Sequence, residues 1–138
     1  MGIFFTNLQN EVTPKVIYEG TEDYKGIIIY RCREKTIINR NNEYLYLDLK
    51  SYANELEMKE KELLESIDYN ISVKSYIAYY RDEKLKVVKV MEVRGLNDLH
   101  RLLKVTGTDL SLLKKTKEKV NKMIQRIQEK EEQEHGKN

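Results

Sequence analysis

The sequence has few of the residues that form disulfides, metal clusters or phosphate-binding loops. Its one cysteine, Cys32, excludes an internal disulfide and a thiolate metal cluster. Cys32 lies in an apolar stretch, which predicts a buried structural thiol and a reducing, cytoplasmic setting. The six glycines are scattered along the chain, so no glycine-rich segment is present to hold a phosphate.

Long apolar runs are also missing. No stretch approaches the roughly 18 consecutive apolar residues that a membrane-spanning helix needs. The N-terminus lacks the basic and apolar regions of a secretory signal. We therefore expect no membrane segment and no secretion.

Residues suited to catalysis are sparse. His100 and His135 are the two histidines, and neither lies at metal-ligand spacing from other ligands, so we expect both to be solvated. Asp48 with Glu57 and Lys59 superficially resembles a nuclease metal centre. Glu57 and Lys59 are expected on helical backbone, however, where they do not converge on one ion with a strand residue. The sequence therefore predicts no enzyme, no metal site and no cofactor.

What the chain does contain is a mixed-charge composition typical of a folded domain. Of its 138 residues, 40% are hydrophobic and 35% are charged, with a net charge of +2. Bulk charge alone therefore does not indicate a nucleic-acid binder. We expect an α+β domain over residues 1–107 and a C-terminal helix with a polar tail over residues 108–138.

The first 43 residues have the pattern of a β-meander. Short β-branched and aromatic runs predict strands over residues 15–19, 26–33 and 36–39. The next run, 44–49, alternates leucines with polar and aromatic residues, which predicts a strand with one apolar face.

The apolar spacing then changes to that of a helix. It predicts one helix over residues 50–58 and a second over residues 59–69. Met58 falls out of phase with a single continuous helix, and such a helix would place Glu60 on its apolar face. Two short helices avoid both conflicts, whereas the alternatives are one amphipathic helix or a plain helical hairpin.

A two-stranded hairpin is expected after the helices. Its strands are predicted at residues 75–81 and 85–93, with a turn at residues 82–84. In this order the strand, the two helices and the hairpin resemble a winged helix-turn-helix, a fold most often used to hold DNA. That family usually has a glycine between the two helices, where this chain has Glu57 or Lys59.

Two further helices are predicted at the C-terminal end. The first spans residues 96–105, with Asn97 as its N-cap and Gly107 just after its end. The second begins at Thr108 or Asp109 and reaches about residue 134. Apolar residues step along it by three and four, as in a coiled-coil seam that joins two chains. The seam consists of Leu113, Thr116, Val120, Met123 and Ile127. The alternative is a helix that lies on the sheet of its own domain.

Charge is distributed unevenly. Residues 44–68 hold seven acidic and three basic residues, so the helix expected to read DNA is acidic. Residues 69–106 hold eight basic and four acidic residues. Positive charge therefore gathers on the hairpin and on the long helix. The residues expected to contact DNA are Lys59, Lys61, Arg81, Lys84, Lys86 and Lys89.

These patterns predict a small homodimeric protein that binds double-stranded DNA through a basic wing. It would act as a transcriptional regulator or as an accessory factor of a plasmid or phage. The alternative is a protein-interaction module, or a phage-type inhibitor that binds a host protein through the acidic helix pair. A third interpretation uses the ten tyrosines, all between Tyr18 and Tyr80, to stack on single-stranded bases.

Overall fold

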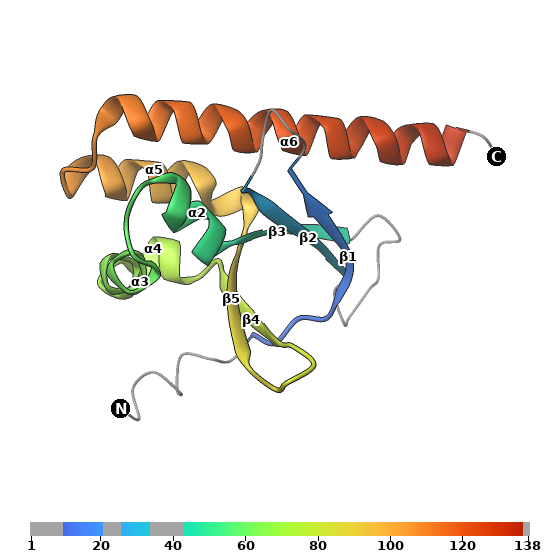
Figure 1. Ribbon diagram of the computed structural model, residues 1–138, viewed down its shortest axis with the longest axis horizontal. Helices are drawn as coiled ribbons and strands as arrows, with labels where there is room; N and C mark the ends of the chain where they lie inside the picture. Colours follow the sequence, from blue (N-terminus) through green and yellow to red (C-terminus); the bar gives the residue numbers. More distant parts are fainter. Residues whose placement is uncertain (1–9, 21–25, 34–42, 137–138) are drawn as a thin grey trace.

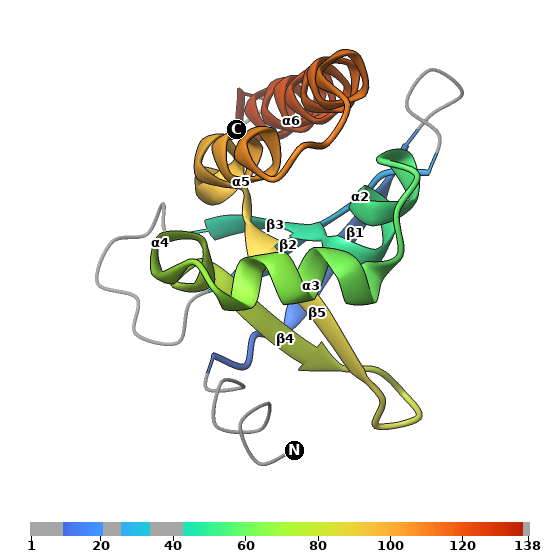
Figure 2. The same ribbon diagram turned by 90° about the vertical axis from the view of Figure 1, so that its left-hand side faces the viewer.

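The fold is an antiparallel sheet with helices packed over one of its faces (Figures 1 and 2). The computed structural model describes residues 10–20, 26–33 and 43–136. Five strands occur in these ranges, in the order β1-β2-β3-β5-β4. The strands are β1 Pro14–Glu19, β2 Ile28–Arg33, β3 Glu43–Asp48, β4 Ile77–Arg81 and β5 Val87–Glu92. The helices are α2 Leu49–Glu55, α3 Glu60–Asp68, α4 Ile71–Lys74, α5 Leu96–Val105 and α6 Leu110–Gly136, with a 3-10 turn at Val93–Gly95. The α+β class is therefore confirmed, whereas the strand expected at residues 36–39 lies outside the described residues.

The sheet curves until its two edges share one segment of chain (Figure 1). β1 pairs with β2 at one edge, and β4 forms the other. Just before β1, the Val12 N–H donates to the Tyr79 carbonyl at 2.8 Å, and the Tyr79 N–H donates to the Asn10 carbonyl at 3.0 Å. The N-terminal lead therefore pairs with β4 and then continues into β1.

The two faces of the sheet support two separate cores. The larger core lies between the sheet and the helices, and it includes Ile29, Leu47 and Met91 with residues from α2, α3, α5 and α6. The smaller core lies on the other face, inside the curve of the strands. It consists of Tyr30, Cys32, Tyr46, Ala78 and Val90. The alternation of side chains along each strand sends neighbouring residues to opposite cores.

The long helix α6 packs on the sheet of its own chain. In Figure 1 it runs across β3, β2 and β1. The five residues expected to form a seam between two chains are almost fully buried in the single chain. Their exposed fractions are Leu113 0%, Thr116 1%, Val120 0%, Met123 4% and Ile127 4%. They are therefore not available to a second helix, and the alternative of a helix on its own sheet describes α6.

The N-terminal strands β1 and β2 provide the apolar surface on which α6 packs within its own chain. β1 and β2 extend the sheet beyond the hairpin, and Ile27 and Ile29 belong to the same core as Val120 and Ile127. An ion pair also connects α6 to α2, because Lys119 Nζ lies 2.6 Å from Glu55 Oε1. The expected boundary at residue 107 consequently does not separate two cores.

Several helix ends follow from local side-chain chemistry. The Asp48 carboxylate accepts the Ser51 N–H at 2.8 Å and so caps α2. Gly107, with φ +93°, follows α5, and the Thr108 N–H donates to the Leu103 carbonyl as in a Schellman motif. The expected Asn97 cap is wrong, because α5 begins at Leu96 and has no side-chain cap.

Candidate nucleic-acid interface

The β4–β5 hairpin ends in a tightly hydrogen-bonded turn. The Asp82 side-chain Oδ1 accepts the N–H groups of Lys84 and Lys86, each at 2.9 Å. The Asp82 carbonyl accepts the Leu85 N–H at 2.9 Å, and the Asp82 N–H donates to the Lys86 carbonyl at 3.0 Å. Leu85 takes a left-handed backbone with φ +62°. This is a three-residue hairpin loop whose last position ordinarily favours glycine.

The strands of the hairpin place basic and aromatic side chains on one face. Tyr79 pairs with Lys89, and Arg81 pairs with Val87. Residues two apart on a strand point to the same side, so Tyr79, Arg81 and Lys89 share a face. The Arg81 guanidinium lies 6.0 Å from the centre of the Tyr79 ring and 4.0 Å from the Glu11 carboxylate. The face therefore carries positive charge supported by an aromatic ring.

The start of α3 lies close to this hairpin. Burial of the Glu60 carboxyl and the charge of Asp48 raise the pKa of Glu60, whereas Lys50 and Lys89 act in the opposite direction. Such effects require charges that are near one another. The charges of Lys89 on β5 and Lys50 at the start of α2 therefore act on the Glu60 carboxyl in the first turn of α3.

The structure places the six predicted DNA-contacting residues in two adjoining groups. One group is the hairpin, with exposed Arg81, Lys84 and Lys86 and half-buried Lys89. The other group is exposed Lys59 and Lys61, which flank Glu60 in sequence. The charge of Lys89 also acts on the Glu60 carboxyl, so the two groups are electrostatically linked. The sequence did not predict a role for Lys50. The pairing of Asp48 with Val90 brings the start of α2 to the strand that carries Lys89, and spacing in the sequence does not encode that pairing.

Most of the exposed surface of α3 is acidic. The helix buries Leu63 and Ile67, while Glu62 and Glu65 are exposed beside Lys61. The turn before it, which joins α2 to α3, contains Glu57 with φ +57°. Glu57 thus adopts the conformation that glycine supplies in the helix-turn-helix pattern. The two-helix arrangement is present, whereas the charge of α3 opposes contact with phosphates.

A hydrogen-bonded chain of polar side chains lies inside the curve of the sheet. The Tyr80 hydroxyl donates to the Tyr30 hydroxyl at 3.1 Å, and the Tyr30 hydroxyl donates to Asp48 Oδ1 at 3.2 Å. Burial, the bond with Tyr80 and the charge of Asp48 raise the pKa of Tyr30, so this hydroxyl remains a donor. The alternation in the sequence predicts that Tyr46 and Asp48 lie on one face of their strand, but it does not predict this series of hydrogen bonds.

Other reactive side chains have structural surroundings. Burial raises the pKa of the Cys32 thiol to about 12, and the expectation of a buried thiol is confirmed. His100 is half-buried, not solvated as expected, and burial together with Lys117 and Lys104 lowers its pKa. Four tyrosines, Tyr30, Tyr46, Tyr52 and Tyr79, are less than 9% exposed, which removes them from stacking on single-stranded bases.

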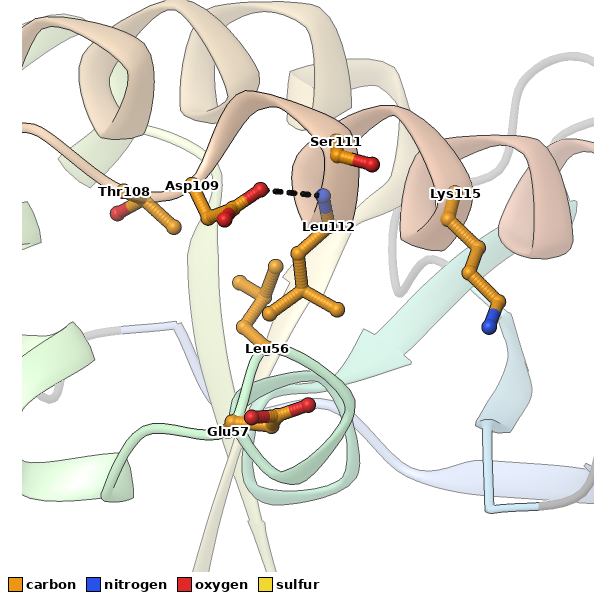
Figure 3. A pocket seen from close by; sticks show the side chains of 7 residues that line it. All are labelled: Leu56, Glu57, Thr108, Asp109, Ser111, Leu112 and Lys115. Atoms are coloured by element: carbon orange, nitrogen blue, oxygen red, sulfur yellow. Dashed lines mark hydrogen bonds between the residues drawn. The ribbon is translucent and has the colours of Figure 1, made fainter.

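An open cleft of about 560 Å³ separates the α2–α3 turn from the start of α6 (Figure 3). Leu56 and Leu112 point toward one another across it. The Asp109 carboxylate accepts the Leu112 N–H at 3.0 Å and so caps α6. Glu57 and Lys115 also line the cleft. Two leucines thus face one another in a lining whose other residues are polar or charged.

No cluster of three or more histidine, cysteine or carboxylate side chains is placed to hold a metal within residues 10–20, 26–33 and 43–136. In the same part of the chain, none of the helices combines the length and apolar character needed to cross a membrane. Comparison with protein-family models, with curated proteins and with solved structures finds no match in any of the three.

Proposed function

We propose that this protein binds double-stranded DNA through its β4–β5 hairpin, with the first turn of α3 alongside. The observation that carries the proposal is the hairpin itself, which exposes Arg81, Lys84 and Lys86 and carries half-buried Lys89 on β5. A basic hairpin can place its cations along the phosphates that border a groove of duplex DNA. Its cations would displace the counterions that surround the phosphates, and this release supplies most of the affinity.

The order of elements agrees with this proposal. β3 is followed by α2, α3 and α4 and then by the hairpin, and β3 pairs with β5. This order of elements is the basis on which we propose a winged helix-turn-helix-like arrangement. Because Glu62 and Glu65 lie on the exposed side of α3, we assign DNA contact to the hairpin and not to α3. The role would be that of a regulator or accessory factor, without a catalytic step.

A binding titration with matched variants tests the proposal. The probe is a labelled duplex of random sequence at low salt, followed by fluorescence anisotropy. The hairpin variant replaces Lys84, Lys86 and Lys89 by alanine, and the control variant replaces Lys114, Lys115 and Lys122 on α6. Figures 1 and 2 place α6 and the hairpin tip at opposite ends of the molecule. We expect weaker binding only for the hairpin variant, and equal weakening by both variants would contradict the proposal.

A protein partner is the second candidate, and one observation favours it. Beside the acidic face of α3, the side chains of Tyr69 and Ile71 are 92% and 88% exposed. Exposed large apolar residues next to charge are typical of protein-binding surfaces. Co-purification of a partner that is lost in Tyr69→Ser and Ile71→Ser variants, together with no duplex affinity at low salt, would decide for this function.

Self-association is a separate proposal. The sequence pattern predicts a homodimer, but the five residues assigned to it are buried by the chain's own core. A dimer would therefore have to use other surfaces. Light scattering over a range of protein concentrations measures whether one forms.

A further inference from the structure

The hairpin tip carries an apolar side chain where the backbone disfavours one. Leu85 is 73% exposed at the end of the loop and has φ +62°. Glycine and asparagine adopt this conformation most easily, whereas a leucine side chain is strained there. Leu85 therefore destabilises the folded state in two ways, through its strained backbone and through the apolar surface that it exposes to water.

The same tip is rigid and basic. Four hydrogen bonds involve Asp82, two accepted by its side chain and two made by its backbone, and they fix the loop. Lys84 and Lys86, both exposed, flank Leu85 by one residue on each side. Below the tip, Val87 is 36% exposed and adds a second apolar group. The loop thus presents one apolar side chain between two cations on a fixed backbone.

We propose that Leu85 is a wedge that enters the minor groove of duplex DNA and partly unstacks one base step. This inference rests on the proposed function and adds the groove, the deformation and the preferred sequence. Leucine is among the apolar side chains that unstack base steps from the minor groove and bend the duplex. Lys84 and Lys86 are placed to reach phosphates on the two strands that border the groove.

Unstacking sets a preference for deformable sequences. Pyrimidine–purine steps such as TA open most easily, whereas A-tracts are stiff. The free energy regained when Leu85 leaves water is therefore offset least at a TA step. We expect the protein to prefer a duplex with a central TA step over an A-tract duplex of equal length and charge.

The experiment compares Leu85→Asn with wild type on these two duplexes. Asparagine suits the left-handed backbone, so the loop is retained while the apolar wedge is lost. A 2-aminopurine beside the TA step reports unstacking by increased fluorescence. Wild type should increase this signal, and Leu85→Asn should abolish it and bind the TA duplex roughly tenfold more weakly. Leu85→Met should restore both effects, and Leu110→Asn, a change to a leucine that is 59% exposed on α6, should alter neither.

The outcomes separate this inference from the proposed function. Tight duplex binding by wild type with no fluorescence change, and with equal affinity for Leu85→Asn, overturns the wedge and leaves the hairpin function standing. No duplex binding by wild type at low salt overturns both. Binding to vesicles of equal phosphatidylserine and phosphatidylcholine that Leu85→Asn abolishes, without any duplex binding, would assign the tip to an anionic membrane and also overturn the inference.

Discussion

At the scale of single residues, strained backbone marks the two turns beside the candidate interface. Among the described non-glycine residues, Glu57 and Leu85 have positive φ. Glu57 joins α2 to α3, and Leu85 ends the hairpin loop. Left-handed backbone costs such residues about 1–2 kcal/mol. Both turns are therefore places where the sequence departs from the residue that would fold most easily.

Glycine at position 57 should stabilise the protein. Glu57→Gly relieves the left-handed strain, and the added freedom of the unfolded chain offsets part of the gain. We expect a net increase of about 0.5–1 kcal/mol in the free energy of unfolding, measured by urea titration. Glu57→Ala is the control, because it removes the charge and keeps the strain. A loss of stability in Glu57→Gly would mean that the Glu57 side chain holds the turn.

Glu60 should make stability depend on pH. Burial and the charge of Asp48 raise its pKa in the folded protein above its ordinary value of 4.5. A carboxyl with a raised pKa favours folding when protonated, so its contribution declines as pH rises from the unfolded value through the folded value. Glu60→Gln should therefore be more stable than wild type at pH 7 and nearly equal to it at about pH 4.

Urea midpoints at the two pH values provide the measurement. Glu65→Gln, an exposed change on the same helix, is the matched control and should shift neither midpoint relative to wild type. Glu60→Gln also removes a negative charge beside Lys89, so it should tighten duplex binding at low salt. A destabilised Glu60→Gln at pH 7 would show that the carboxylate is favourably paired instead.

At the scale of elements, α6 is part of the core and not an attached arm. The spacing of its apolar residues predicts one stripe that joins two chains, whereas the structure buries that stripe in the core of its own chain. The partner that buries the stripe was not predictable, because a coiled-coil seam and a helix on a sheet have similar periodicity. Only the pairing of β1 with β2, and of β2 with β3, shows that the sheet extends beneath Val120 and Ile127. The hairpin, in contrast, follows from local alternation and is confirmed.

A charge in the buried stripe of α6 should unfold the protein. Val120 is 0% exposed, so Val120→Asp would bury an unpaired carboxylate and lose apolar packing, at a cost of about 3–5 kcal/mol. Thermal unfolding with size-exclusion light scattering measures the result. Asn121→Asp, at an exposed neighbouring position, should leave the melting temperature unchanged. Folded monomers of Val120→Asp with the wild-type melting temperature would instead support the seam between two chains.

At the scale of the whole molecule, the curved sheet connects the N-terminal lead to the hairpin. The Asn10 side chain donates to the Ile77 carbonyl at 3.4 Å across a separation of 67 residues. No periodicity in the sequence encodes such a pairing, so the closure of the sheet was not predicted. The hydrogen bonds that join Tyr80, Tyr30 and Asp48 were not predicted either, because these residues come from three strands. The basic hairpin was predicted, because its charges are contiguous in sequence.

Closure of the sheet also bears on how the hairpin works. β4 is held on one side by β5 and on the other by the N-terminal lead. The lead pairs with β4 at Tyr79, two residues before Arg81, and β5 pairs with Arg81 through Val87. In the proposed binding mode the hairpin would meet DNA as a preformed surface, which lowers the entropy lost on binding.

The salt dependence of duplex binding tests the central claim most directly. The slope of log K against log salt concentration should be reduced by about 0.9 for each phosphate contact removed. Replacing Lys84, Lys86 and Lys89 by alanine should therefore reduce its magnitude by roughly 2.7, whereas replacing Lys114, Lys115 and Lys122 should leave it unchanged. An unchanged slope in the hairpin variant, or the same reduction in the α6 variant, would contradict DNA binding through the hairpin.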